Sequence, residues 1–427
     1  MPPMWARSLI LALLAIGGGC RRTTHGAADA GDLGDALLPT GVSDAPPVRT
    51  ACRRVGGQAV PSLDHAADGG LEALVATPGD GGVRVFWSVA GAGTLGRWST
   101  GQTTAGAIEA GSGDRSDPVL ATDGRGALAA AWVGSRMGAR EHVLWTTDSA
   151  TGRCSGAEGR DEGLSLSLAG LARGWLIVWD EDGPAPAAGN IRGQVVTVGA
   201  QGILCGAQRT LSPAPQDAAD PMAVALPGGR AVVFWLTARD VDATESNDTA
   251  TDIWGVAIGP SGAPVGAPLR VTRTVDHHFG LSALAGPDAV WLGLRGGGPS
   301  DSEGRGDGGE VRVVRVDVGP LGLARAGDPG VVSDDGANPT GAPRVTRSLT
   351  AGAATEVWWR ERRGERIEVR HRSIDASGRP LTAALPSWVE PAMGATLPSW
   401  VDERAQAWVA RIDGDGAEVA RFACTVP

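Results

Sequence analysis

Two residue types are missing from this chain of 427 residues. It contains no tyrosine, and all 38 of its basic residues are arginine, so it has no lysine either. Schiff-base chemistry, the phosphate-binding lysine of a P-loop and tyrosine nucleophiles are therefore excluded. A genome rich in G and C, whose codons favour Arg, Ala, Gly and Pro, explains both absences without reference to function.

The charge pattern excludes a further class of partner. The formal net charge is -10, and acids and arginines are interspersed, without the basic patch that neutralises a phosphate backbone, so we expect no binding to nucleic acid. No Ser/His/Asp order, paired carboxylate or Gly-rich phosphate loop stands out. The sequence thus predicts no catalytic residue, no cofactor and no metal ligand set.

What the chain does contain is a recurring hydrophobic phrase that ends in tryptophan, as in Ala231-Val-Val-Phe-Trp235. The copies of this phrase end at or near Trp87, Trp132, Trp179, Trp235, Trp291, Trp358 and Trp408. The spacing runs from 45 residues (Trp87 to Trp132) to 67 residues (Trp291 to Trp358). A period near fifty residues indicates a repeated supersecondary unit.

The fourth unit shows the pattern of one repeat. An apolar strand over 220–226 opens with Asp220-Pro221, a Gly turn follows, and residues 230–236 form the tryptophan strand. Two further strands, about 252–258 and 267–272, alternate more and carry charge. The predicted fold is an all-β single β-propeller of four-stranded antiparallel blades. Seven blades are expected, while six or eight stay open because the stretch 286–344 is long.

The tryptophan in each repeat has two possible interpretations. Tryptophans can stack on sugars, but a large aromatic at one place in every repeat is also what packing between blades requires. We interpret the seven tryptophans as core residues.

The last unit has only three strands before the chain stops, so its fourth strand must come from elsewhere. Residues 48–55 form a short β-like run before the first complete unit, and placing this run in the last blade closes the ring. It also brings Cys52 beside Cys424. By elimination Cys154 would pair with Cys205, although ring symmetry holds equivalent outer positions too far apart for a disulfide unless a loop departs from it.

The N-terminus reads as an export signal. Arg7 precedes a short apolar run over 8–16, and small residues lead to Cys20, so residues 1–19 are predicted to be a signal peptide. The site resembles the lipobox of bacterial lipoproteins, which implies lipidation of Cys20, although Gly17 stands where that family usually has leucine. Cleavage by the ordinary signal peptidase is the alternative. Residues 20–47 would be a lipidated cysteine with a flexible tether, and 48–427 the propeller.

Function is expected in what the repeats do not share, above all the loops 240–252 and 296–309. The first of these holds the one weak calcium candidate, which lacks the glycine and regular spacing of a dedicated calcium loop. Its possible ligands are Asp240, Asp242, Asp248 and Asp252.

With its repeats and lipobox, the chain resembles the propeller lipoproteins of GC-rich bacteria such as myxobacteria. The resemblance covers about 48–427. The tether, the ring and the absence of a catalytic constellation favour a monomeric, non-catalytic binding scaffold that is anchored in the cell envelope only through its lipid, on the outer membrane at its periplasmic or surface face. The ligand would be a protein or a glycan. The alternative is a polysaccharide hydrolase or lyase with carboxylates gathered at the ring centre.

Overall fold

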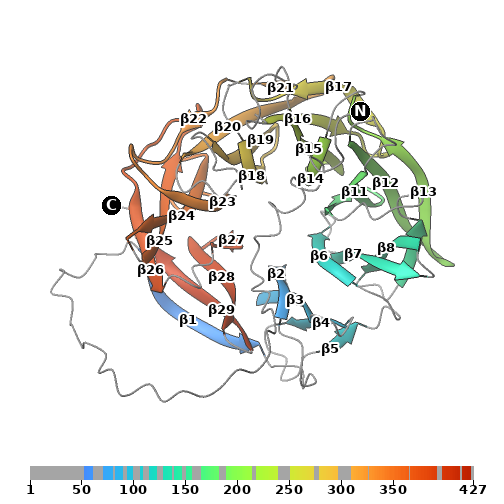
Figure 1. Cartoon of the computed structure of the whole chain (residues 1–427), viewed down its shortest axis with the longest axis horizontal. Coiled ribbons are helices and arrows are strands. Elements are labelled where there is room, and N and C mark those ends of the chain that lie inside the picture. Colours follow the sequence, from blue (N-terminus) through green and yellow to red (C-terminus); the bar gives the residue numbers. More distant parts are fainter. Residues whose placement is uncertain are drawn as a thin grey trace, which may run out of the picture.

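The computed structural model is an all-β ring (Figure 1). The structure describes residues 52–60, 71–79, 82–89, 94–99, 106–108, 115–122, 128–136, 139–146, 151–155, 165–181, 189–213, 218–238, 251–273, 278–296, 309–325, 327–364, 366–391, 397–413 and 416–424. The predicted signal peptide, Cys20 and the tether lie outside these residues. In the described part, no helix is long and apolar enough to cross a bilayer.

The described strands form seven antiparallel sheets, numbered here in chain order. The first three sheets are β2 (Leu71–Gly79), β3 (Gly82–Val89), β4 (Thr94–Ser99) and β5 (Gly106–Ile108); β6 (Arg115–Thr122), β7 (Leu128–Arg136), β8 (Ala139–Thr146) and β9 (Thr151–Ser155); and β10 (Leu166–Leu171), β11 (Gly174–Glu181), β12 (Asn190–Gly199) and β13 (Gly202–Thr210).

The remaining sheets follow the same order around the ring. They are β14 (Ala218–Leu226), β15 (Arg230–Ala238), β16 (Thr251–Ile258) and β17 (Pro264–Arg270); β18 (His278–Ala285), β19 (Ala289–Gly296), β20 (Glu310–Gly319), β21 (Gly322–Arg325) and β22 (Gly330–Val331); β23 (Pro339–Thr346), β24 (Thr355–Arg363), β25 (Arg366–Ile374) and β26 (Leu385–Pro391); and β27 (Trp400–Val401), β28 (Gln406–Asp413), β29 (Gly416–Cys424) and β1 (Cys52–Val60).

The first strand of each sheet lies toward the middle of the ring and the last lies outside (Figure 1). Because neighbouring strands are antiparallel, successive connections emerge on alternate faces. We call the side with the turns between first and second strands and between third and fourth strands the turn face. The opposite side, which carries the second-to-third connections and the links between sheets, is the loop face.

Strand β1 closes the ring by pairing with β29, in a register that sets Cys52 opposite Cys424. The two cysteines form a disulfide, and Cys154 forms the other with Cys205. Both predicted pairings are thus confirmed. The expected loop excursion was wrong, because Cys154 and Cys205 lie within the outer strands β9 and β13, with their Cα atoms 5.7 Å apart. Gly152 allows this approach, since a Cβ there would clash with Ile203.

Removing the ring-closing disulfide is expected to cost more stability than removing the other one. Cys52 and Cys424 are 372 residues apart, against 51 for Cys154 and Cys205. On chain entropy alone, the longer loop is worth about 2 kcal/mol more. Urea unfolding of the double variants C52S/C424S and C154S/C205S measures the difference. Equal losses, or a larger loss for C154S/C205S, would contradict the entropic argument.

The core lies between the sheets rather than within one. One buried cluster joins Leu176 and Val178 of the third sheet to Val233 and Trp235 of the fourth, and another joins Val232 and Phe234 of the fourth sheet to the fifth. Strand β15 therefore alternates its side chains between two neighbours, which explains why the second strands are continuously apolar.

Candidate functional site

A pair of carboxylates lies where the third and fourth sheets meet on the loop face. Ser165 directly precedes β10, Asp180 is near the end of β11, and Asp220 lies in β14, the first strand of the next sheet. The Ser165 hydroxyl donates to Asp220 Oδ1 over 3.2 Å, and the Ser165 backbone N–H donates to Asp180 Oδ1 over 3.3 Å. One serine thus bridges both acids, which we call the carboxylate pair.

Burial and mutual repulsion change the ionisation of the carboxylate pair. Loss of solvent raises the pKa of Asp220 to about 6, with the charge of Asp180 adding to the rise and the Ser165 hydroxyl opposing it. Burial also raises the pKa of Asp180, while backbone N–H groups of Ser165 and Asp220 lower it. Asp220 is therefore the acid that holds a proton near pH 6, and Asp180 is the carboxylate that backbone N–H groups stabilise.

The backbone at Asp220 is in an unfavourable conformation for an aspartate. Its φ is 52°, in a bulge where β14 leaves register with β15 between Ala219 and Met222. The bulges in the first strands of the next two sheets place glycines there, Gly280 with φ 65° and Gly341 with φ 67°. An aspartate kept where its neighbours use glycine is a strained residue, and such residues concentrate at functional sites.

Sequence reasoning missed this site. The one sequence feature that pointed to it was the Asp220-Pro221 dipeptide at the start of the fourth repeat, which we interpreted as the beginning of a strand. The opening is shared with Asp117-Pro118, which also falls at a bulge, between Ser116 and Val119 of β6. Asp180 gave no signal beyond following Trp179.

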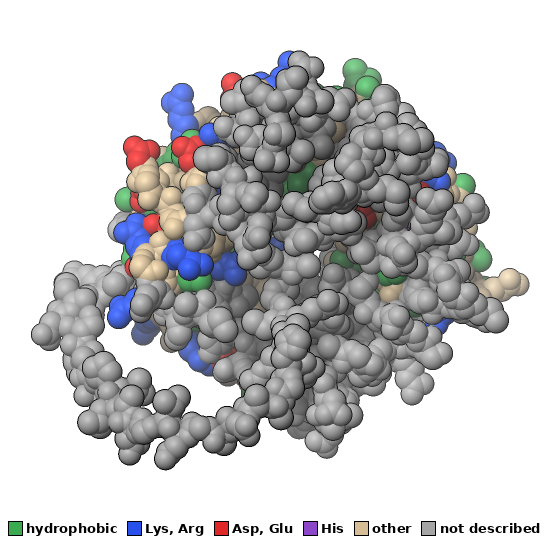
Figure 2. Space-filling view, viewed as in Figure 1, with side chains coloured by type: hydrophobic (Ala, Val, Ile, Leu, Met, Phe, Trp, Pro, Cys, Tyr) green, Lys and Arg blue, Asp and Glu red, His purple; other side chains and the backbone are tan. Residues whose placement is uncertain are grey.

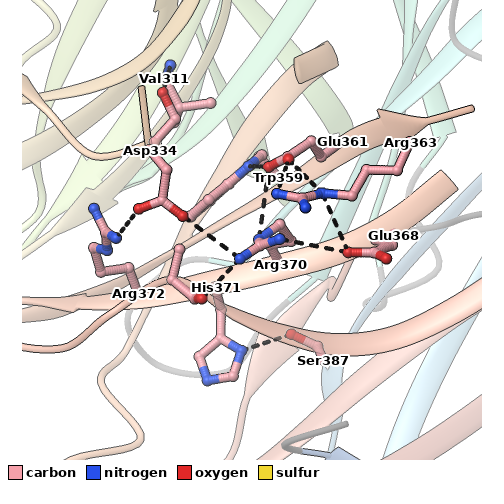
Figure 3. Close-up of polar contacts among 12 residues, drawn as sticks. Val311, Asp334, Trp359, Glu361, Arg363, Glu368, Arg370, His371, Arg372 and Ser387 are labelled. Atoms are coloured by element: carbon pink, nitrogen blue, oxygen red, sulfur yellow. Dashed lines mark hydrogen bonds and ion pairs between the residues drawn. The ribbon is translucent and has the colours of Figure 1, made fainter. Parts of the chain in front are cut away.

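A second polar cluster lies in the sixth sheet (Figure 3). Arg370 is buried, and its guanidinium lies 3.6 Å from Glu361, 3.4 Å from Glu368 and 3.5 Å from Asp334, while donating to the carbonyl of Ala384. Arg363 also pairs with Glu361, and Arg372 pairs with Asp334. Three guanidiniums meet three carboxylates, so the cluster neutralises itself and serves packing.

Charged side chains also mark this part of the surface. Figure 2 shows arginine and acidic side chains gathered on the edge of the ring that β22 to β26 form in Figure 1. Alternation along β25 sends Arg370 and Arg372 toward the fifth sheet, where Arg372 donates to the carbonyl of Val332. His371 points the other way (Figure 3).

His371 belongs to a Ser–His–Glu arrangement on three adjacent strands. Its Nδ1 lies 2.6 Å from Ser387 Oγ, and its Nε2 lies 3.7 Å from Glu356 Oε1. All three side chains are buried, and the His371 ring lies tilted against Trp358 with the ring centroids 4.6 Å apart. Burial lowers the pKa of His371 to about 4 and raises that of Glu356 to about 7. A neutral imidazole closed off from solvent holds the sixth sheet together and is not placed to attack a substrate.

Glu356 should make stability depend on pH. Its pKa rises from 4.5 unfolded to about 7 folded, so the folded state binds the extra proton between these values and stability falls as pH rises through them. We expect E356Q to match the wild type near pH 4.5 and to be more stable at pH 8, by up to roughly 3 kcal/mol. Denaturant titrations of both proteins across this range test it; parallel pH profiles would contradict it.

The repeated tryptophans all lie on second strands, but they do not share one orientation. Trp132, Trp179, Trp235, Trp291 and Trp358 are buried. Trp179 packs with residues of the second sheet and Trp235 with the third, whereas Trp291 packs with the sixth sheet and Trp358 with the seventh. A shift of one residue along a strand reverses the face.

The other two tryptophans differ from these five. Trp408 is partly exposed, stacks on Trp400 at 5.6 Å and donates its indole N–H to Asp402. The strand of Trp87 is described, but its side chain is outside the described set.

The calcium candidate is not assembled in the described residues. Asp252 is buried and pairs with Arg270, and Thr272 donates to its other oxygen. Asp240, Asp242 and Asp248 lie outside the described residues, as do most of the two loops in which we expected function. The described ranges contain no group of three or more His, Cys, Asp or Glu side chains that could hold a metal ion.

Comparison with known proteins identifies the fold. No protein-family model matches the chain, and no curated protein matches it in sequence. Among solved structures, an ulvan lyase from a new polysaccharide lyase family matches with a TM-score of 0.53 and 12% identity, over 83% of this chain and 94% of that one. An α-L-arabinanase of Penicillium chrysogenum matches with a TM-score of 0.42 and 10% identity, over 72% and 92%.

A subtype N10 neuraminidase-like protein also matches, with a TM-score of 0.42 and 7% identity, over 73% of this chain and 95% of that one. Likeness at such low identity shows the fold alone. Together with the four-stranded antiparallel sheets, it confirms the predicted fold class: the chain is an all-β propeller.

Proposed function

We propose that this protein hydrolyses a neutral polysaccharide at the carboxylate pair. The observation that carries the proposal is the bridging of Asp180 and Asp220 by Ser165, in surroundings that raise the pKa of Asp220 to about 6. Glycoside hydrolysis requires two carboxyl groups of different protonation, one acid and one carboxylate. The ulvan lyase match adds that a ring of this fold can carry polysaccharide chemistry.

The two acids would divide the reaction between them. Asp220 donates its proton to the glycosidic oxygen as the bond to the anomeric carbon breaks, and Asp180 stabilises the positive charge that develops there. Water adds to the anomeric carbon and returns a proton to the pair. Ser165 positions both carboxyl groups. A polymer of uronic acids would be repelled by two carboxylates, so the substrate is expected to be uncharged.

The test is release of reducing ends from a panel of neutral polysaccharides, including arabinans, glucans and xylans. The wild type should be active on at least one and should lose activity above about pH 6, as Asp220 loses its proton. D180N and D220N should be inactive. D288N, which changes an exposed aspartate on the turn face, is the matched control and should retain full activity. A wild type inactive on the whole panel would refute hydrolysis.

Binding without cleavage, the role predicted from sequence, is the second candidate. The two hydrogen bonds of Ser165 favour binding without cleavage. A serine that donates to both carboxyl groups can hold two strands together without taking part in a reaction. Calorimetric titration with the same glycans separates the two candidates. A scaffold would bind one of them without turnover, and D220N would weaken that binding.

The cellular setting of this proposal is the bacterial envelope. Cys20 would carry a lipid, and the residues after it would tether a monomeric propeller to the membrane. The basis is the apolar run ahead of Cys20 and the small residues that precede it. Labelled palmitate should enter the full chain and should not enter C20A.

A further inference from the structure

We propose that the turn face of the ring rests on an anionic lipid bilayer, with leucines of its outer turns in contact with the membrane. The loop face, which carries Asp180 and Asp220, would then be directed away from the bilayer. The inference rests on the proposed lipid anchor at Cys20 and adds an orientation to it. It does not depend on whether the carboxylate pair is catalytic.

The point at which the tether joins the ring fixes which face lies nearest the anchor. Strand β28 ends and β29 begins on the loop face, where Asp413 pairs with Gly416, so β29 ends on the turn face at Cys424. Cys52 pairs with Cys424, so β1 begins on the turn face as well. Thirty-one residues separate Cys20 from Cys52. As the tether expected from the sequence, a chain of that length would span about 30 Å, which would keep the turn face close to the bilayer.

Exposed apolar side chains gather on the same face. Five large hydrophobic residues are exposed among those the structure describes: Val198, Leu204, Leu321, Val331 and Leu381. All except Val331 lie at or beside a turn between the third and fourth strands, in the third, fifth and sixth sheets. Leu321 is 89% exposed at the end of its turn. Single exposed leucines are ordinary, but turns from three sheets on one face form a plane that can meet a flat surface.

The charges on the described turns suit this partner. Four arginines and four acids lie there, so these turns are balanced in charge although the whole chain carries a net charge of -10. The residues are Arg173, Arg347, Arg379 and Arg404, with exposed Asp288 and Glu403 and half-buried Asp375 and Asp402. Arginine beside exposed leucine is the combination that anionic headgroups attract.

The fifth sheet offers a matched pair of positions for a test. Leu321 lies in the turn after β20, on the turn face, and Val331 pairs with Arg312 near the other end of the same strand. Their levels differ by about 25 Å along β20. Both are exposed hydrophobic residues in one sheet, Leu321 at 89% and Val331 at 38%, and they occupy opposite faces of the ring.

The full lipidated chain would be placed in vesicles of phosphatidylethanolamine and phosphatidylglycerol that contain a spin-labelled lipid. A fluorophore would be attached to L321C or to V331C; the native cysteines of the ring are in disulfides, so the introduced thiol reacts. We expect the spin label to quench fluorescence several-fold more at position 321 than at 331. L381C, on the turn face of the sixth sheet, should be quenched like L321C. This second position keeps the test valid if one of the two variants misfolds.

Flotation of the vesicles is measured in the same samples. If the chain floats but quenching is equal at the two positions, or greater at 331, the orientation is overturned while the anchor stands. If the chain does not float, the anchor at Cys20 fails and the membrane-bound turn face fails with it. Hydrolysis is measured separately in solution, so loss of that proposal leaves this result unaffected.

Discussion

D220G is expected to abolish polysaccharide hydrolysis and, at the same time, to make the protein more stable at pH 8. Activity should fall by about 10²-fold to 10⁴-fold, because the general acid is gone. Stability should rise by about 2 kcal/mol. If Asp220 served only the fold, replacing it would not improve stability, so a loss of activity together with a gain of stability would not be seen.

The gain in stability has two sources. Glycine adopts a φ of 52° without strain, as Gly280 and Gly341 do in the next two sheets, and the relief is worth about 1 kcal/mol. The larger source is the desolvated charge. The folded pKa of Asp220, about 6, lies above the ordinary 3.8, so the wild type loses stability as pH rises from about 4 past 6. The greater conformational freedom of glycine in the unfolded chain lowers the stability of D220G and offsets part of these gains.

Urea unfolding at pH 8 and pH 4.5 measures the effect. The advantage of D220G should nearly vanish at pH 4.5, where Asp220 is protonated in the folded wild type. D288G is the control: Asp288 is exposed and lacks a positive φ, so its replacement by glycine should not stabilise at either pH. A D220G variant less stable than the wild type at pH 8 would show that backbone strain and desolvation at Asp220 do not reduce the stability of the folded protein.

The ring itself was within reach of sequence reasoning. Strand-length hydrophobic phrases that end in tryptophan gave the repeat, and a last repeat short of one strand gave the closure that β1 and β29 make. These features depend on local pattern and on count. The orientation of individual tryptophans was not predictable in the same way, because a one-residue shift in pairing sends Trp235 to one neighbouring sheet and Trp291 to the other.

The carboxylate pair was out of reach for a different reason. Its members lie near the ends of three strands in two sheets: Ser165, Asp180 and Asp220. No rule of sequence spacing links these positions. Their contact depends on a bulge in β14 that only the pairing register reveals. The charge on the third strands gave no sign of burial either. Arg370 of β25 is buried, and it pairs with Glu361 and Glu368 of its own sheet and with Asp334, which follows the fifth sheet.

R370M is expected to destabilise the fold by about 3 to 5 kcal/mol at pH 7. Arg370 lies between Glu361, Glu368 and Asp334, and methionine would fill much of its volume without its charge. Glu361 would keep Arg363 and the indole N–H of Trp359, but it would lose the guanidinium buried beside it. A buried carboxylate that loses its buried counter-ion costs far more than the original pair contributed.

R363M is the matched control on the same carboxylate. The Arg363 side chain is 50% exposed and pairs with Glu361 from the surface, so its loss should cost less than about 1 kcal/mol. Denaturant unfolding of both variants at pH 7 decides the matter: equal losses for R370M and R363M would mean that Arg370 acts through packing alone.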